Sequence, residues 1–118
     1  MAITGAHVLL YSSAEDELRA VFRDVFNWKH VDAGDGWLIF ALAPSEIGVH
    51  PAEGPIRHQF SLMCDDIGAT VRDLREKGIV VRGEPEDQGW GISVMLALPG
   101  DVEVQLYEPR HPVAASPA

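Results

Sequence analysis

The sequence has little that would cross-link it, carry it into a membrane or draw it to nucleic acid. Its single cysteine, Cys64, cannot form an internal disulfide, and no apolar run reaches the roughly 20 residues that a membrane-spanning helix needs. Nine basic residues stand against eighteen acidic ones, for a formal net charge of −9. A charge of this sign repels phosphate backbones and anionic lipids, so we expect neither nucleic-acid nor membrane partners. The sequence begins without the basic and apolar regions of a secretory signal, which predicts a cytoplasmic protein.

Several catalytic motifs are also missing. We find no phosphate-cradling glycine loop, no CxxC pair and no Ser-His-Asp order. What remains is an ordinary globular composition: 118 residues, 47% of them hydrophobic. We expect one domain over residues 1–111, followed by a flexible tail of Pro, Ala and Ser over residues 112–118.

The first half of the sequence predicts a strand, a helix and three strands, from about residue 5 to residue 51. "AHVLLYS" is typical of a strand, and "SSAE" is a capping box in which Ser12 caps the first helical turn. Apolar residues then recur at helical spacing, and Asn27 can adopt the left-handed conformation that ends a helix. "WKHV", "GWLIFALA" and "EIGVH" are predicted to be strands.

The second half, from about residue 57 to residue 109, repeats this order. "HQFSLMC" predicts a strand, Asp66 caps a second amphipathic helix, and Gly78 ends it. Three more strands are expected in "IVVRG", "GISVMLAL" and "VEVQLY". Landmarks recur as well, such as "DGW" ending at Trp37 and "QGW" ending at Trp90. These echoes predict two diverged copies of one βαβββ module.

Polar residues occupy related places in the two modules. His7 in the first strand of module one corresponds to Gln59 in module two, and His50 in the last strand corresponds to Gln105. Side chains alternate along a strand, so Glu46, Gly48 and His50 share one face. The residue that module one presents from its last strand therefore stays open among these three, with His50 favoured by the internal repeat.

This order resembles the vicinal oxygen chelate superfamily, which includes glyoxalase I, bleomycin-resistance proteins, fosfomycin-resistance enzymes and extradiol dioxygenases. The segments that carry the resemblance are "GAHVLLYS", "HQFSLMCDDIGATVRDLREKGIVV" and "LPGDVEVQLYEP", and it spans roughly Gly5 to Pro109. The resemblance implies an α+β fold in which two βαβββ modules form a curved mixed sheet around a cavity, with the helices outside. It also implies a homodimer whose site draws residues from one chain or from both.

One function implied by the resemblance is a metal-dependent lyase or dioxygenase. A divalent ion of iron, manganese, nickel or zinc would be held by His7, His50, Gln59 and Gln105 and would chelate substrate oxygens. Two imidazoles and two neutral amides bring no negative charge, and a carboxylate from Glu46 or Glu103 would make the set more conventional. In this interpretation Tyr107 or Glu103 moves protons.

The alternative function is a binding protein without a metal. Bleomycin-resistance relatives use the same cavity to sequester a cationic or aromatic antibiotic between acidic walls and tryptophans. The net charge and the neutral glutamine pair favour this interpretation. The expected ligand contacts are Trp90, Trp37, Met63 and Arg110. Each also has a structural interpretation, packing for the tryptophans and a surface salt bridge with Glu108 for Arg110. A degenerate copy kept for partner interaction is a third possibility.

Overall fold

The computed structural model describes residues 6–55 and 57–114, which form two helical segments and six strands. In chain order the elements are α1 (Glu15–Ala20), η1 (Val21–Val25), β1 (His30–Asp32), β2 (Leu38–Phe40), β3 (Ser61–Met63), α2 (Ile67–Glu76), β4 (Val80–Asp87), β5 (Gly91–Leu98) and β6 (Val102–Pro109). β1 and β2 form an antiparallel pair, and the other strands form one sheet in the order β3-β6-β5-β4. In this larger sheet β3 runs parallel to β6, and the remaining pairs are antiparallel. The predicted α+β fold with a mixed sheet is confirmed.

Helix α2 forms where its sequence predicts. The Asp66 side chain accepts a hydrogen bond from the Ala69 N–H at 3.0 Å, which satisfies one of the unpaired donors of the first turn. Glu108 supplies a second acceptor, because its Oε1 lies 3.1 Å from the Ile67 nitrogen. At the other end Gly78 has φ +84°, the left-handed conformation that glycine adopts without strain.

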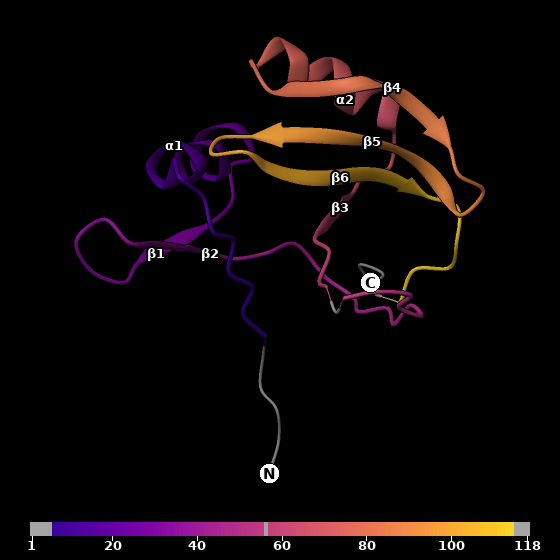
Figure 1. Cartoon of the computed structure of the whole chain (residues 1–118). Helices are drawn as coiled ribbons and strands as arrows, with labels where there is room; N and C mark the ends of the chain where they lie inside the picture. The colour runs from indigo at the N-terminus through magenta and orange to yellow at the C-terminus, as the bar shows by residue number, and fades with distance from the viewer. Residues whose placement is uncertain (1–5, 56, 115–118) are drawn as a thin grey trace.

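The hydrophobic core lies between α2 and one face of the four-stranded sheet (Figure 1). Helix α2 turns its buried residues, Ile67, Val71 and Leu74, toward this face. Every second residue of β5 and β6 faces α2, because successive side chains of a strand point to opposite faces. The strand residues that are buried are Val94, Leu96, Leu98, Val104 and Leu106. The opposite face of the same strands is therefore left open.

The N-terminal helix differs in detail from its prediction. α1 begins after Ala14, and no side chain caps it, so the predicted capping box at Ser12 is wrong. Ser12 Oγ instead donates to the Pro99 carbonyl at 2.8 Å and accepts from the Ala14 N–H at 3.0 Å. This hydroxyl fastens the start of the helix to the β5–β6 turn. The helix continues as a π-helical turn and ends at Asn27, whose φ of +57° matches the predicted left-handed stop.

Two predicted strands of module one do not form. Neither residues 6–12 nor residues 46–50 belong to a strand of the described structure. The physical reason is pairing: an isolated extended segment leaves its N–H and C=O groups without ladder partners, and neither segment has a neighbouring strand here. Module two, in contrast, shows the complete order β3-α2-β4-β5-β6.

The predicted C-terminal tail is described only in part. Of the predicted tail, Ala114 donates its N–H to Glu46 Oε1 at 2.8 Å, and residues 115–118 lie outside the described part. Within residues 6–55 and 57–114, no helix is both long and apolar enough to span a bilayer. The cytoplasmic location stays a prediction.

Candidate functional site

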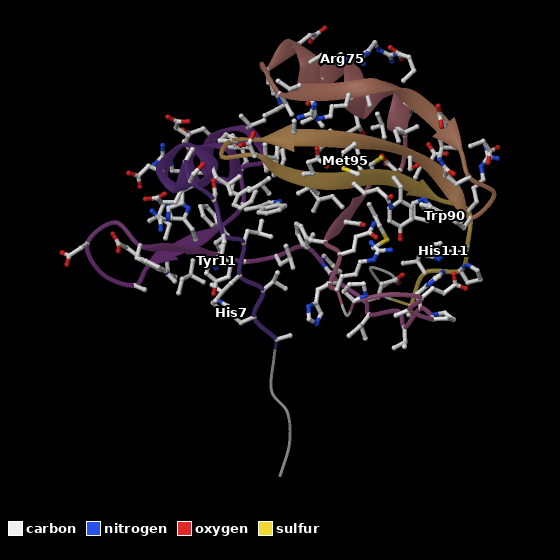
Figure 2. The ribbon with its side chains drawn as sticks, viewed as in Figure 1. His7, Tyr11, Arg75, Trp90, Met95 and His111 are labelled. Atoms are coloured by element: carbon white, nitrogen blue, oxygen red, sulfur yellow. The ribbon has the colours of Figure 1, made fainter. Side chains whose placement is uncertain are left out.

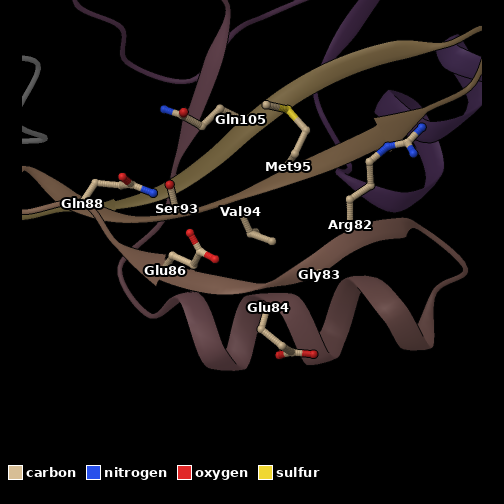
Figure 3. A pocket seen from close by; sticks show the side chains of 9 residues that line it. All are labelled: Arg82, Gly83, Glu84, Glu86, Gln88, Ser93, Val94, Met95 and Gln105. Atoms are coloured by element: carbon tan, nitrogen blue, oxygen red, sulfur yellow. The ribbon is translucent and has the colours of Figure 1, made fainter.

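The open face of the four-stranded sheet carries rows of aligned side chains. One row runs Ser61, Gln105, Met95 and Arg82 across β3, β6, β5 and β4. The next row runs Met63, Tyr107, Ser93 and Glu86 across the same strands. Paired residues of neighbouring strands share a face, so these side chains all point away from the core. Figure 3 shows Arg82, Met95 and Gln105 projecting from their strands away from α2.

Two hollows adjoin on this face. The first has a volume of about 290 Å³ and is lined by Arg82, Gly83, Glu84, Glu86, Gln88, Ser93, Val94, Met95 and Gln105. The second has a volume of about 340 Å³ and is lined by Arg57, His58, Gln59, Phe60, Met95, Glu103 and Gln105. Met95 and Gln105 border both hollows, so they mark the centre of the candidate site. Its lining mixes neutral amides, a thioether and charges of both signs.

An aromatic corner lies around Tyr107 of the second row. The Trp90 and Tyr107 rings meet nearly edge to face, with centroids 5.3 Å apart, and the His111 ring lies 5.8 Å beyond Tyr107. Arg110 ties the segment after β6 to β4, because its Nη1 lies 2.8 Å from Asp87 Oδ2. Its backbone N–H also donates to the Trp90 carbonyl at 2.9 Å. Figure 2 shows Trp90 and His111 close together beside the sheet.

The surroundings of Tyr107 shift the pKa of its phenol. Burial raises the pKa of its phenol above the ordinary value, and the carboxylate of Glu46 raises it further. A raised folded-state pKa favours the neutral phenol in the native protein. Its stabilising contribution is present below the ordinary tyrosine pKa of about 10 and is lost as the pH rises through the folded value.

This shift predicts a measurable alkaline titration. Tyr11 and Tyr107 are the only tyrosines, so in a Tyr11→Phe background the tyrosinate absorbance reports Tyr107 alone. We expect its ionisation above pH 10 or so, with the free energy of unfolding falling over the same range. Glu46→Gln should lower the pKa without restoring the ordinary value, because burial remains. If Glu46→Gln leaves the pKa of Tyr107 unchanged, the carboxylate of Glu46 does not act on Tyr107.

The structure brings several of the predicted site residues together. Gln59 and Gln105 line the same hollow, and Gln59 Nε2 donates to Ser61 Oγ at 3.3 Å. Glu103 lines that hollow too, and Arg82 Nε lies 3.6 Å from its Oε1. Met63 and Tyr107 are cross-strand partners on the open face.

Other predicted residues lie elsewhere. His7 and His50 are exposed and line neither hollow, and His50 Nδ1 donates to the adjacent Pro51 carbonyl at 2.8 Å. Trp37 stands near β2, where the guanidinium of Arg19 lies 5.0 Å from its ring centroid. The predicted salt bridge between Arg110 and Glu108 is not seen among the described residues. Arg110 pairs with Asp87, and Glu108 contacts the start of α2.

The residues of the hollows do not fit a divalent metal ion. Within residues 6–55 and 57–114, no three His, Cys, Asp or Glu side chains gather as a metal site requires. The second hollow offers one imidazole and one carboxylate, and Arg57 beside them repels a cation. Neutral amides bring no compensating charge. The set of His7, His50, Gln59 and Gln105 stays a prediction, which requires both histidines to reach this hollow.

Some residues of the site were missed from the sequence. Ser93 and Met95 could have been found, because the alternation in "GISVMLAL" places them opposite the apolar residues of β5. Arg82 and Glu86 come from either side of an irregularity in β4, which sequence periodicity does not reveal. Cys64 is not part of the candidate site. Burial raises the pKa of its thiol, and nearby carboxylates raise it further. The thiol is therefore a poor nucleophile.

The fold has relatives among solved structures. No family model and no curated protein sequence matches the chain. The antibiotic binding protein TnmS3 from Streptomyces sp. CB03234 is 22% identical, with a TM-score of 0.67 over 92% of this chain and 98% of that one. A lactoylglutathione lyase from Agrobacterium tumefaciens is 22% identical, with a TM-score of 0.64 over 89% of this chain and 92% of that one.

A third structure carries the superfamily in its description. It is a member of the glyoxalase/bleomycin resistance protein/dioxygenase superfamily from Sphaerobacter thermophilus. It is 19% identical, with a TM-score of 0.60 over 90% of this chain and 98% of that one. All three similarities span about nine-tenths of the chain. The chain therefore has the fold of the glyoxalase/bleomycin resistance protein/dioxygenase superfamily, the vicinal oxygen chelate fold that its sequence resembles.

Proposed function

We propose that this protein binds a small organic molecule on the open face of the β3-β6-β5-β4 sheet, without a metal ion. The observation that carries the proposal is the pair of hollows of about 290 and 340 Å³, which meet at Met95 and Gln105. The first is slightly smaller than the roughly 300–1,000 Å³ typical of ligand pockets and the second is at the lower end of that range, and together they offer room for a larger molecule. Met95 and the neutral amide of Gln105, where the two hollows meet, suit binding more than bond making.

The side chains define a ligand class. The thioethers of Met63 and Met95 are flexible and polarisable, and they adapt to flat apolar surfaces. Gln59 and Gln105 each present a donor and an acceptor that can orient a bound molecule. The net charge of −9 disfavours anions. The best ligand is therefore a flat aromatic molecule, neutral or cationic, with a few hydrogen-bonding groups.

Filling the shared centre should abolish binding. Met95→Trp places an indole where the two hollows meet, and we expect it to weaken the binding of aromatic fragments by about 100-fold or more, because the new ring occupies the ligand's volume. The measurement is a binding titration with a library of neutral and cationic aromatic fragments. Protein NMR monitors the titration, and a chelator is present throughout. Val80→Trp is the matched control, because Val80 shares this face but lines neither hollow. Equal binding by parent and Met95→Trp would place the ligand elsewhere.

A metal-dependent lyase or dioxygenase is the second candidate, favoured by the similarity to a lactoylglutathione lyase. It needs His7 and His50 to join Gln59 and Gln105, with Tyr107 or Glu103 moving protons. Elemental analysis and titration with iron(II), manganese(II), nickel(II) and zinc(II) separate the two candidates. Stoichiometric binding that His7→Ala abolishes would overturn the metal-free proposal and favour the metal-dependent candidate.

We also propose that a second copy of the chain covers residues 6–12 and 47–50 of module one, which form no strand of the described structure. Their apolar residues stand in water: Leu9 is 57% exposed, Tyr11 88%, Ile47 94% and Val49 96%. Such clusters are characteristic of interaction sites in soluble proteins. In module two the corresponding strands pair in parallel as β3 and β6, and β3 lies at the edge of its sheet. In a two-fold dimer, these segments can pair with a strand of the second copy, and the same segments of that copy can pair with a strand of the first.

Charges on the exposed apolar residues should separate the dimer. Ile47→Glu with Val49→Glu is expected to yield a monomer, because two charges would be buried without partners. Light scattering coupled to gel filtration measures the mass. Val31→Glu is the control, since Val31 is 61% exposed on β1, outside the two segments. A monomeric parent, or a dimer that survives the double substitution, would contradict the interface.

A further inference from the structure

The imidazole of His111 is held through both of its nitrogens. Nδ1 lies 2.8 Å from the carbonyl oxygen of Pro112, the next residue in the chain. Nε2 lies 3.1 Å from the hydroxyl of Tyr107, which lies between Met63 and Ser93 in the second row on the open face. His111 thus makes direct contact with a side chain of the open face, and neither residue lines a hollow.

These two contacts determine where the protons lie. A carbonyl oxygen only accepts hydrogen bonds, so Nδ1 carries a proton and donates it to Pro112. In a neutral imidazole the other nitrogen is then bare and acts as an acceptor. The Tyr107 hydroxyl therefore donates to His111 Nε2. We propose that His111 fixes the direction of the Tyr107 hydroxyl proton, so that the phenol oxygen meets a bound ligand as a hydrogen-bond acceptor.

The position of Tyr107 suits such a role. Its backbone carbonyl accepts from the Cys64 N–H at 2.9 Å, and Ser93 of β5 is its cross-strand partner, so its main chain is held between two strands. Ser93 and Glu86 continue its row and line the first hollow. The Trp90 ring packs against the phenol and limits its rotation. His111 is a positioning residue, because it acts on the ligand only through Tyr107.

The inference rests on the proposed function and narrows its ligand class. A phenol whose proton is committed elsewhere offers only lone pairs, so this end of the site selects molecules with an N–H or O–H donor. The charged groups around Tyr107 and His111 also favour a ligand that carries a hydrogen-bond donor. Glu46 places a carboxylate near Tyr107, and Arg110 is already paired with Asp87.

One test needs no ligand. In the Tyr11→Phe background, His111→Leu keeps apolar bulk against Tyr107 but removes the acceptor. A hydrogen bond that the neutral phenol donates raises its pKa, so His111→Leu is expected to lower the pKa of Tyr107. The opposite tautomer would donate to the phenolate, and its loss would raise that pKa. His30→Leu is the control, because His30 Nδ1 also faces a local carbonyl, that of Trp28 at 3.4 Å, without touching Tyr107. An unchanged or raised pKa in His111→Leu overturns the proposal.

A second test measures selectivity with two probes. Indole carries one N–H donor, and 1-methylindole has the same ring without it. We expect indole to bind the parent protein about fivefold more tightly, the contribution of one hydrogen bond, and expect Tyr107→Phe to remove the difference. His111→Leu should reduce it, because the phenol proton is then free to turn toward the ligand. Equal affinities in the parent overturn the acceptor role. If neither probe binds, the proposed function fails at this site, and the Tyr107 titration still decides the hydroxyl direction.

Discussion

Leu96→Ala is expected to lower the free energy of unfolding by about 3–5 kcal/mol, the range for emptying a well-packed core site. Leu96 has no exposed surface and lies in the middle of β5, in the cluster that α2 covers. Truncation leaves a cavity that strands paired on both sides cannot collapse around. Chemical denaturation followed by circular dichroism measures the change.

The neighbouring residue on the strand supplies the control. Met95→Ala removes a side chain of similar size from the open face, where no element packs over it, and should cost about 1 kcal/mol or less. The contrast between adjacent residues tests which face of β5 is core and which is site. Equal losses for the two variants would mean that the open face is packed, which the proposed function does not allow.

Gly100→Ala is expected to destabilise the protein by about 3 kcal/mol, from backbone strain and overpacking together. Gly100 has φ +80°, and a Cβ there would lie 2.8 Å from the backbone nitrogens of Ser13 and Ala14 and collide with Ser12 Oγ. The hydroxyl of Ser12 already donates to the Pro99 carbonyl. The new methyl therefore forces the start of α1 away from the β5–β6 turn.

Gly83→Ala isolates the backbone part of this cost. Its φ of +79° matches that of Gly100, but no atom lies within 4 Å of the position of a Cβ. We expect a loss of about 1 kcal/mol from the left-handed conformation alone. Thermal unfolding of both variants gives the difference. If Gly83→Ala proves as costly as Gly100→Ala, the contact between the helix start and the turn contributes nothing.

The sequence predicted module two well, because local signals there agree with the final packing. Asp66 and Gly78 mark the ends of a helix whose apolar spacing matches its buried face. "GISVMLAL" coincides with the whole of β5, and its alternation places Leu96 inside and Met95 outside. Such agreement between capping, periodicity and burial makes a segment predictable.

Module one was less predictable, because its first and last strands depend on partners that no local pattern specifies. "AHVLLYS" and "EIGVH" have strand composition, yet ladder hydrogen bonds come from a neighbouring strand. The site residues divide the same way. Gln59 and Gln105 line one hollow because Gln59 comes just before β3, which pairs with β6, whereas His7 and His50 lie on segments that form no strand of the described structure. The sequence predicted no role for His111, since its contact with Tyr107 arises where the chain bends back after β6.

The central claim, metal-free binding on the open face, is tested most directly through the methionines. The chain has three, Met1, Met63 and Met95, and the last two share the open face. Isotope-labelled methionine methyl groups, assigned with Met63→Leu and Met95→Leu, report on that face by NMR. We predict that aromatic fragments shift the Met95 and Met63 signals with a chelator present, and that manganese(II) without chelator broadens neither. Fragments that bind without moving either signal, or manganese(II) that broadens Met95 in the parent but not in His7→Ala, would contradict it.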